Sequence, residues 1–291
     1  MENLQKVLII VNPISGNIDK TDIVDRIVSV LNEKNIAFEI YKTTGENDHA
    51  EIVKILDRQK FDRIFVLGGD GTLKMLAEVL KDETTAVALF PTGSANGLSV
   101  NLNIPDNLNS QIDIALGGNK ISIDMLKIED EICLHISDFG LNAELIKNYE
   151  ASAIRGKMGY LLQSLPTLWE SRYPFDFTIK YNDKEIKRSG VFLAFSNAQK
   201  YGTGAVVNPN AKMDDGIFEV LIFKDFDVKE ILKTLSNEIE FDPNIVEIFP
   251  VKEVEVFCHQ PVSFQIDGEY CGEKEKVSVK LSTRKLPILI P

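Results

Sequence analysis

The first third of the chain alternates between continuous apolar runs and segments whose apolar residues recur at helical spacing. The helical spacing is clearest where Ile23, Ile27 and Val30 fall on one face. Strands that are apolar throughout and alternate with helices are typical of a parallel sheet with both faces covered. The pattern predicts strands at residues 6–11, 37–41, 64–67 and 85–90, with a helix after each of the first three.

The pattern changes near residue 120, where apolar and polar residues begin to alternate with a period of two. This alternation starts at Ile121–Asp124 and is typical of antiparallel sheets. We therefore expect a Rossmann-like parallel α/β domain at residues 1–119 and an antiparallel β-sandwich at residues 120–284, with a cleft between them. The strands expected in the second domain are 177–181, 191–195, 218–223, 254–257, 262–266 and 277–281, with a hairpin turn at Asn182–Asp183 and helices at 157–171 and 228–239.

Three polar loops that contain glycine follow strands of the predicted parallel sheet. They read NPISGN at residues 12–17, GGDGT at 68–72 and PTGSANG at 91–97. In open parallel sheets, ligands bind at the carboxyl ends of the strands. The three loops together therefore predict one nucleotide site at that edge of the sheet.

The GGDGT loop carries the most informative residue of the chain. It lies between an apolar strand and a helix, so backbone N–H groups and the helix dipole favour an anion, and glycine lets a phosphate come close. An acid inside such a loop, Asp70, would repel phosphate unless it handles a metal ion or a proton. The loop lacks the lysine of the P-loop motif and the third glycine of the dinucleotide motif. An ordinary strand-to-helix turn is the alternative interpretation.

Composition narrows the class of protein. The 291 residues carry a formal net charge of −12, with a pI of about 4.9, which argues against nonspecific binding to nucleic acid. No apolar run approaches the ~18–20 residues of a membrane span, and residues 1–3 do not resemble the start of a signal peptide. The cysteines and histidines show no disulfide or metal-binding spacing. We expect a cytoplasmic protein that is peripheral to a membrane at most.

Five blocks of the sequence resemble the diacylglycerol kinase catalytic-domain family. They are VNPISG, GGDGT followed by a helix, PTGSANGLS, the stretch NAQKYGTGAVVNPNAKMDDGIFEV and the late IDGE, and they span nearly the whole chain in order. The family includes bacterial soluble lipid kinases and sphingosine kinases, and NAD kinases are distant relatives. The resemblance implies that an α/β domain binds ATP, that a β-sandwich domain completes the cleft, and that residues 285–291 return to the first domain.

The resemblance also implies roles for individual residues. Asp70 would lie near Mg²⁺ and the transferred phosphate, and Asp215 matches a position tied to a structural magnesium in bacterial members. Asp267 and Glu269 match the segment that carries the proposed base of bacterial lipid kinases, whereas sphingosine kinases give that role to the aspartate matching Asp70. The resemblance leaves open which carboxylate acts. The residues that would contact the nucleotide are Asn12, Ser15, Gly16, Thr44, Gly68, Gly69, Gly71, Thr72, Thr92, Gly93, Ser94 and Asn96.

Asp215 and Asp267 each have a structural alternative. Both precede a glycine, and Asp-Gly pairs are common in turns. Phosphoryl transfer needs mainly hydrogen-bond donors to the phosphate groups, a magnesium ion and a carboxylate near the attacking hydroxyl. Mg²⁺ takes one or two carboxylates, and waters and phosphate oxygens complete its shell. The aspartates supply suitable oxygen ligands for that chemistry.

Two features bear on the lipid substrate. The third loop, at residues 93–98, is closer to the sphingosine kinase pattern than to the G-T-x-N-D-F of many diacylglycerol kinases. Glu144 lies in a block where sphingosine kinases place an amine-binding aspartate, and a solvated carboxylate is the alternative. The helix expected at 157–171 would either cover an acyl chain or belong to the core. The sequence leaves the lipid open.

Three functions remain for the chain. The main hypothesis is an ATP- and Mg²⁺-dependent lipid kinase that phosphorylates the hydroxyl of a diacylglycerol-like or sphingoid lipid. The alternatives are an NAD kinase-like transferase, which shares GGDGT, and a nucleotide-binding module without catalysis. A lipid is the expected partner and nucleic acid is not. Contact with a membrane surface would be transient because no basic patch would anchor the chain to anionic lipid, and a homodimer is left open.

Overall fold

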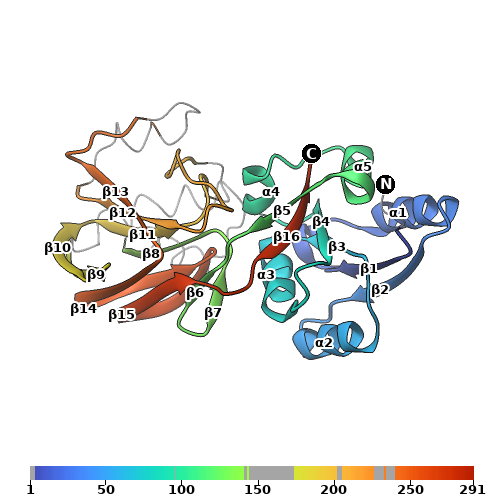
Figure 1. The fold of residues 1–291 in the computed structure, drawn as a ribbon, viewed down its shortest axis with the longest axis horizontal. Helices are drawn as coiled ribbons and strands as arrows, with labels where there is room; N and C mark the ends of the chain where they lie inside the picture. Colours follow the sequence, from blue (N-terminus) through green and yellow to red (C-terminus); the bar gives the residue numbers. More distant parts are fainter. Residues whose placement is uncertain are drawn as a thin grey trace. The chain divides into compact units, whose positions relative to one another are not determined.

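The computed structural model describes residues 4–94, 96–140, 174–201, 205–225 and 240–291, together with Ala143 and Lys233 (Figure 1). The chain divides into two compact units: the first is Met1–Ile123 with Thr283–Pro291, and the second is Asp124–Ser282. The helix expected at 157–171 lies outside the described residues, as does the helix expected at 228–239 apart from Lys233. Among the described helices, none has both the length and the apolar character that crossing a bilayer requires.

The sheet of the first unit contains β1 (Lys6–Val11), β2 (Ala37–Lys42), β3 (Arg63–Gly68), β4 (Ala86–Pro91), β5 (Asn119–Ile123) and β16 (Leu286–Ile290). Their order across the sheet is β2-β1-β3-β4-β16-β5. Neighbouring strands from β2 to β16 are parallel, and β5 at the edge is antiparallel to β16. The predicted α/β architecture is confirmed, with a sheet that is mixed but mostly parallel.

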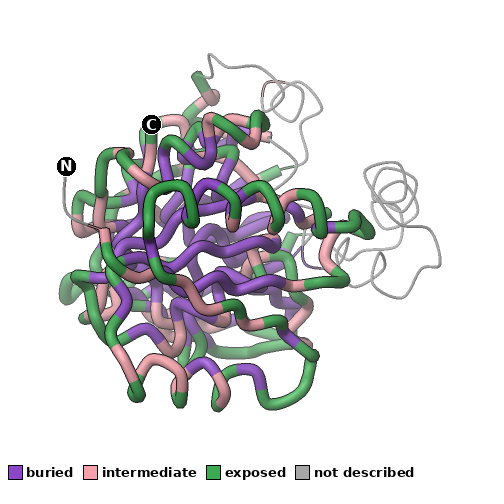
Figure 2. The backbone as a smooth tube through the Cα atoms, turned by 90° about the vertical axis from the view of Figure 1, so that its right-hand side faces the viewer, coloured by how far each residue is buried: buried purple, intermediate pink, exposed green. Residues whose placement is uncertain are grey.

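The described helices of this unit are α1 (Thr21–Glu33), α2 (Asp48–Arg58), α3 (Asp70–Val79), α4 (Gly97–Asn101) and α5 (Leu108–Gly117), with a 3₁₀ turn at Ser15–Asn17. On one face of the sheet, Ile9 of β1 shares a core with Ile27 of α1 and Ile112 of α5. On the other face, α2 and α3 contact each other (Figure 1). Because both faces are covered, β1, β3 and β4 are buried along almost their whole length (Figure 2). The three helices predicted between strands are confirmed, whereas α4 and α5 were not foreseen.

The boundary between the units falls after Ile123 rather than after Asn119. Residues 119–123 form β5, which pairs with β16 along the edge of the first sheet. A strand with one covered face alternates apolar and polar residues whichever sheet it joins. The period-two pattern at Ile121–Asp124 therefore did not reveal the sheet to which this strand belongs. β16 lies between β4 and β5, so the last strand of the chain is an interior strand of the first unit.

The second unit is an antiparallel β structure, as predicted. Its described strands are β6 (Leu126–Ile128), β7 (Glu131–Cys133), β8 (Ile136–Gly140), β9 (Phe175–Tyr181), β10 (Lys184–Gly190), β11 (Phe192–Ser196), β12 (Phe218–Phe223), β13 (Val246–Val251), β14 (Glu253–Ile266) and β15 (Glu269–Leu281). The order is β13-β12-β11-β8-β14-β15-β6-β7, and β9 pairs with both β10 and β14. The pairings are all antiparallel among the described strands.

One prediction for this unit is wrong and another is confirmed. The strands predicted at 254–257 and 262–266 form a single strand, β14. The polar stretch between them looked like a break, but the register against β15 shifts between Phe257 and Val262, which lets the strand continue. The turn at Asn182–Asp183 is confirmed, because both residues have the positive φ (46° and 58°) that a two-residue type I′ hairpin requires.

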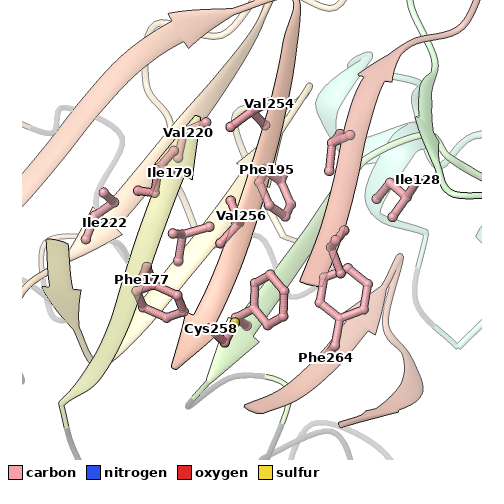
Figure 3. Packing of buried hydrophobic residues seen from close by; sticks show 14 of the residues in the cluster. Ile128, Phe177, Ile179, Phe195, Val220, Ile222, Val254, Val256, Cys258 and Phe264 are labelled. Carbon is pink, nitrogen blue, oxygen red and sulfur yellow. The ribbon is translucent and has the colours of Figure 1, made fainter. Parts of the chain in front are cut away.

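Aromatic rings organise the core of the second unit (Figure 3). The ring centroid of Phe139 on β8 lies 4.6 Å from that of Phe264, 6.0 Å from Phe177 and 6.2 Å from Phe195. Tilted and edge-on pairs at these separations are favourable beyond their burial. Since the partners come from β14, β9 and β11, one ring connects four strands. This packing fixes the end of β14, which leads into the Asp267 turn.

Candidate functional site

The carboxyl ends of β1, β3 and β4 lie side by side at one edge of the first sheet, because the strands are parallel neighbours. Two backbone hydrogen bonds extend the pairing beyond the strands. The Asn12 N–H donates to Leu67 O over 2.9 Å, and the Thr92 N–H donates to Gly68 O over 2.9 Å. The loops that follow are thereby brought together, and we call them loop 1 (residues 12–20), loop 2 (68–72) and loop 3 (91–97).

A side-chain hydrogen bond joins loop 1 to loop 2. Asn12 Nδ2 donates to Thr72 Oγ1 over 3.1 Å, while Asn12 Oδ1 accepts the N–H of Ile14 over 3.2 Å. Thr72 is buried in the first turn of α3, and a Cβ placed on Gly68 would lie 2.4 Å from its Oγ1. Asn12 therefore connects the start of loop 1 to α3, and Gly68 has no room for a side chain.

Loop 1 is packed against loop 3 at Gly16. This residue has a φ of +65°, and a Cβ there would lie 2.2 Å from the carbonyl oxygen of Thr92. The neighbouring Ser15 Oγ donates to the same carbonyl over 3.4 Å and to Asn12 O over 3.2 Å. Gly16 is thus required by the approach of another loop of the protein as well as by its own backbone conformation.

Loop 3 is packed against loop 2 in a similar way. A Cβ on Gly93 would lie 2.5 Å from the Cα of Gly69. The side chain of Asn96 closes loop 3, because its Oδ1 accepts the Gly93 N–H (2.9 Å) and its Nδ2 donates to Gly93 O (3.0 Å). The sequence attributed these glycines to a ligand that comes close, whereas the structure shows that a neighbouring loop already occupies the space at Gly16 and at Gly93, and that Thr72 of the same loop occupies it at Gly68.

Asp70 is the first residue of α3 and caps a second helix with its side chain. Its Oδ2 accepts the N–H of Gly97 over 2.7 Å, and its Oδ1 accepts the N–H of Leu98 over 3.2 Å. These donors begin α4, where N–H groups have no partner within the helix. Asp70 of loop 2 is therefore stabilised by hydrogen bonds from the start of α4, which follows loop 3. No local motif could predict this contact, because the partners are far apart in the sequence.

The site retains polar groups suited to an anion. Thr92 is only 6% exposed, and its Oγ1 has no hydrogen-bond partner among the described residues. The N-terminus of α3 lies in loop 2, and the first N–H groups of a helix, together with its dipole, attract negative charge. A buried hydroxyl without a partner is costly, and a bound polar ligand would satisfy it. These features fit the phosphate chain of a nucleotide.

Thr44 follows β2 at the same edge of the sheet. Its N–H and its hydroxyl lie 2.9 and 3.3 Å from Asp48 Oδ1, to which they donate, and the Gly45 N–H donates to Asp48 Oδ2 over 2.8 Å. The Tyr41 hydroxyl also donates to Asp48 Oδ1, over 2.6 Å. These bonds close the loop on itself, and within the described part of the chain Thr44 has no hydrogen bond to loops 1 to 3.

Asp267 lies in the second unit and holds a turn. Asp267 and Gly268 connect β14 to β15 with φ values of 49° and 88°, and Glu269 follows as the exposed first residue of β15. The carboxylate is engaged by donors of the β7–β8 turn. Leu134 N–H donates to Oδ2 (2.8 Å), and His135 N–H (2.9 Å), Ile136 N–H (3.3 Å) and Cys133 Sγ (3.3 Å) donate to Oδ1.

We expect Asp267→Ala to lower the free energy of unfolding of the second unit by about 3 kcal/mol, because backbone donors lose a charged acceptor. Asp183→Ala is the matched control. Asp183 also lies in a two-residue turn with positive φ, and its exposed side chain has no hydrogen bond within the described residues. Urea denaturation measures both variants. Equal losses would show that the cost comes from the turn backbone and not from the anchored carboxylate.

His135 adds a dependence on pH. The residue is 6% exposed, and burial lowers its pKa from 6.5 to about 4. The unfolded chain therefore binds a proton near pH 6.5 that the folded chain does not bind until about pH 4. Between these values the unfolded state holds more protons, so stability falls as the pH falls.

We expect the buried imidazole to lower the free energy of unfolding by about 2 kcal/mol between about pH 7 and about pH 5. Urea denaturation at both pH values, on the wild type and on His135→Gln, isolates this contribution from that of the carboxylates. The variant should lose less stability than the wild type over the same interval. Equal losses would contradict the assignment.

Asp215 lies in an exposed turn before β12. Its Oδ1 accepts the Ile217 N–H over 3.2 Å, and buried Asp124 accepts the neighbouring Gly216 N–H over 2.8 Å. Burial raises the pKa of Glu219 on β12. The hydrogen bond from Asn208 opposes this shift and the charge of Asp215 reinforces it.

Amide oxygens near these carboxylates could contribute to a cation site. The Oδ1 atoms of Asn197 and Asn208 are buried, and neither has a hydrogen-bond partner within the described ranges. Asn197 Nδ2 donates to Asp124 O (2.7 Å), and Asn208 Nδ2 donates to Glu219 Oε2 (2.7 Å). Within the described residues, no three His, Cys, Asp or Glu side chains are placed to hold a metal ion. A hard cation such as Mg²⁺ would therefore need amide oxygens and water here.

The residues predicted for the site fall into separate groups. Ser94 and Gly71 are exposed members of loops 3 and 2, and Glu144 lies outside the described residues. Asp215, Asp267 and Glu269 belong to the second unit. The sequence did not predict that Asp48 closes the loop after β2, that Asp124 accepts the Gly216 N–H, or that Gly97 and Leu98 donate to Asp70. Loops 1 to 3 bring together Asn12, Ser15, Gly16, Gly68, Gly69, Asp70, Thr72, Thr92, Gly93 and Asn96.

Known proteins resemble this chain along nearly its whole length. Proteins named Probable lipid kinase YegS from Shigella dysenteriae and Escherichia coli are each 23% identical over 249 residues, which is 83% of this chain and 83% of theirs. The fold is similar to that of a diacylglycerol kinase from Bacillus anthracis, with a TM-score of 0.78, 19% identity and coverage of 100% of this chain and 98% of the other.

A more distant fold similarity is to an NAD kinase from Archaeoglobus fulgidus in complex with ATP. The TM-score is 0.56 with 14% identity, over 98% of this chain and 93% of the other. Family models describe both units. Residues 6–128 match the Diacylglycerol kinase catalytic domain, and residues 137–289 match the YegS C-terminal NAD kinase beta sandwich-like domain. As its motifs predicted, the chain belongs to the diacylglycerol kinase catalytic-domain family, with a YegS-type C-terminal domain.

Proposed function

We propose that the chain is an ATP- and Mg²⁺-dependent lipid kinase whose acceptor is the hydroxyl of a diacylglycerol-like or sphingoid lipid. The observation that carries the proposal is the meeting of three loops at one sheet edge, where the buried Thr92 hydroxyl has no hydrogen-bond partner in the part of the chain that the structure describes. A lipid acceptor is supported by the relatives named Probable lipid kinase YegS. ATP would supply the γ-phosphoryl group.

The residues of this edge would bind and orient phosphate groups. The N-terminus of α3 offers N–H groups and a favourable dipole. The Thr92 hydroxyl would donate a hydrogen bond to the nucleotide. Because loops 1 to 3 already hold one another through Asn12, Gly16 and Gly93, little backbone entropy would be lost on binding.

Asp70 is the carboxylate that we assign to the reaction. It lies at the start of α3, and its hydrogen bonds from α4 fix its position. A magnesium ion in a nucleotide site is commonly held by one or two carboxylates together with phosphate oxygens and water, and Asp70 would provide such a ligand. Asp267 is assigned a structural role instead, because four donors of the β7–β8 turn engage its carboxylate, three backbone N–H groups and the Cys133 thiol, whereas α4 supplies two donors to Asp70. Asp215 is proposed to contribute to a separate structural magnesium site, with the buried amide oxygens of Asn197 and Asn208 as candidate further ligands.

The experiment is a transfer assay with the purified full chain and ATP labelled in the γ position. Diacylglycerol and sphingosine are offered separately in mixed micelles, and NAD is offered as a competing acceptor. Label that moves into the organic phase with one of the lipids supports the proposal. Label found only in phosphorylated NAD would replace the lipid kinase by an NAD kinase-like transferase. Binding of ATP without transfer to any acceptor would leave a nucleotide-binding module.

A further inference from the structure

Lys20, the residue before α1, is a lysine buried in the first unit. It is only 4% exposed. Its ammonium donates to main-chain carbonyls of loop 1: Ser15 O at 2.6 Å, Ile18 O at 3.1 Å and Pro13 O at 3.5 Å. An ammonium has three N–H donors, so the carbonyls of one loop engage its full donor capacity.

A buried ammonium is ordinarily paired with a carboxylate, because desolvating an unpaired charge is costly. Lys20 has no ion pair among the described residues. The adjacent Asp19 accepts instead from Thr21, through its N–H (2.9 Å) and its hydroxyl (2.7 Å). Burial lowers the pKa of Lys20, and the charge of Asp19 partly opposes that shift. The position thus keeps a costly cation whose described partners are all loop carbonyls.

The carbonyl contacts determine how loop 1 presents its N–H groups. In a planar trans peptide, the C=O and the N–H of the next residue point in opposite directions. Since Ser15 O faces the ammonium, the Gly16 N–H points away from it. Gly16 is also the residue packed against the carbonyl of Thr92, whose hydroxyl has no hydrogen-bond partner among the described residues. Lys20 therefore draws carbonyl oxygens, which would repel a phosphate, into the interior of loop 1.

We propose that Lys20 is a positioning residue of the nucleotide site: it holds loop 1 so that carbonyls face inward and the Gly16 N–H faces outward toward a phosphate. This inference rests on the proposed binding of ATP at this sheet edge. Lys20 acts through the loop and is not assigned contact with the reacting atoms. Its removal should weaken the binding of phosphate-bearing nucleotides and spare adenosine, which has no phosphate.

The test measures the Kd of ATP and of adenosine by calorimetry for the wild type, Lys20→Met and Lys20→Arg. Methionine keeps an unbranched side chain of similar length without donors or charge, whereas arginine keeps both the donors and the charge. Lys34→Met is the control, because Lys34 is an exposed lysine just after α1. We expect Lys20→Met to raise the Kd of ATP about tenfold or more and to change that of adenosine by less than about twofold. Lys20→Arg should recover part of the loss, and Lys34→Met should match the wild type.

The outcomes that would contradict the positioning role of Lys20 are also defined. An unchanged ATP Kd in folded Lys20→Met, or equal losses for ATP and adenosine, overturns the positioning role. If Lys20→Met does not fold, Lys20→Gln, which retains amide donors, takes its place. Failure of both to fold would make Lys20 a determinant of the fold alone and would also overturn the proposal. A wild type that binds no ATP would refute the proposed function itself, and this is visible before any variant is compared.

Discussion

Replacing Asp70 by asparagine should abolish phosphoryl transfer while the first unit keeps its fold. The substitution preserves volume and removes the negative charge at the start of α3, where the proposed mechanism requires a carboxylate. We expect the rate to fall about a hundredfold or more, equivalent to roughly 3 kcal/mol in the barrier. The transfer assay with the best lipid acceptor measures this effect.

The structure adds a stability effect to this prediction. Asp70 accepts the N–H groups of Gly97 and Leu98, one on each carboxylate oxygen. Asparagine retains a single acceptor oxygen, so one donor of α4 loses its partner. The expected cost is about 1–2 kcal/mol in the free energy of unfolding, which a melting curve would detect.

Asp57→Asn is the control, since Asp57 is exposed near the end of α2. It should change neither activity nor stability. Activity of Asp70→Asn within about threefold of the wild type, less than ~1 kcal/mol in the barrier, would remove Asp70 from the reaction. If Asp70→Asn is inactive only because it is unfolded at the assay temperature, the main role of Asp70 would be to cap α4.

Gly16→Ala should separate loops 1 and 3 and weaken nucleotide binding. Its Cβ would lie 2.2 Å from the Thr92 carbonyl oxygen, a distance that can be relieved only by moving the backbone of one loop. The φ of +65° adds a strain of about 1 kcal/mol for any residue with a Cβ. We expect a total loss of stability above about 2 kcal/mol and a rise in the ATP Kd of about tenfold or more.

Gly45→Ala isolates the packing contribution. Gly45 lies in the loop after β2 with a φ of +85°, and no atom lies within 4 Å of the Cβ position. This variant should show the backbone strain alone, about 1 kcal/mol, with ATP binding preserved. Equal effects of the two substitutions would mean that close packing between loops 1 and 3 does not shape the site.

Continuous apolar runs were sufficient to predict β1, β3 and β4 and the sheet edge at which these strands end. β1 has the bounds that its apolar run predicted, Lys6–Val11, because both faces of the strand are buried. The parallel order of β1, β3 and β4 then follows from the intervening helices, and it places three glycine-containing loops together. Local pattern is informative here because each strand and its loop are adjacent in the sequence.

Long-range contacts were not predictable from one sequence. Asp70 meets Gly97 and Leu98 through tertiary structure, and the Asp267 carboxylate meets the β7–β8 turn across more than a hundred intervening residues. The sequence allowed two interpretations of this segment, a turn at Asp267-Gly268 or a catalytic role for Asp267 and Glu269, and it does not show which donors surround the Asp267 carboxylate. β5 was assigned to the wrong sheet because alternation reveals burial of one face and not the identity of the partner strand.

Amide NMR with ¹⁵N-labelled glycine tests the location of the nucleotide most directly. Titration of the full chain with ATP should shift the amide signals of Gly16, Gly69 and Gly71, and adenosine should shift them far less. Gly190 and Gly272, both in the second unit, serve as internal references. Their amide signals should not shift at lower ATP concentrations than those of Gly16, Gly69 and Gly71. Saturating ATP that leaves the glycine signals of loops 1 and 2 unchanged would contradict the assignment of this sheet edge as the phosphate site.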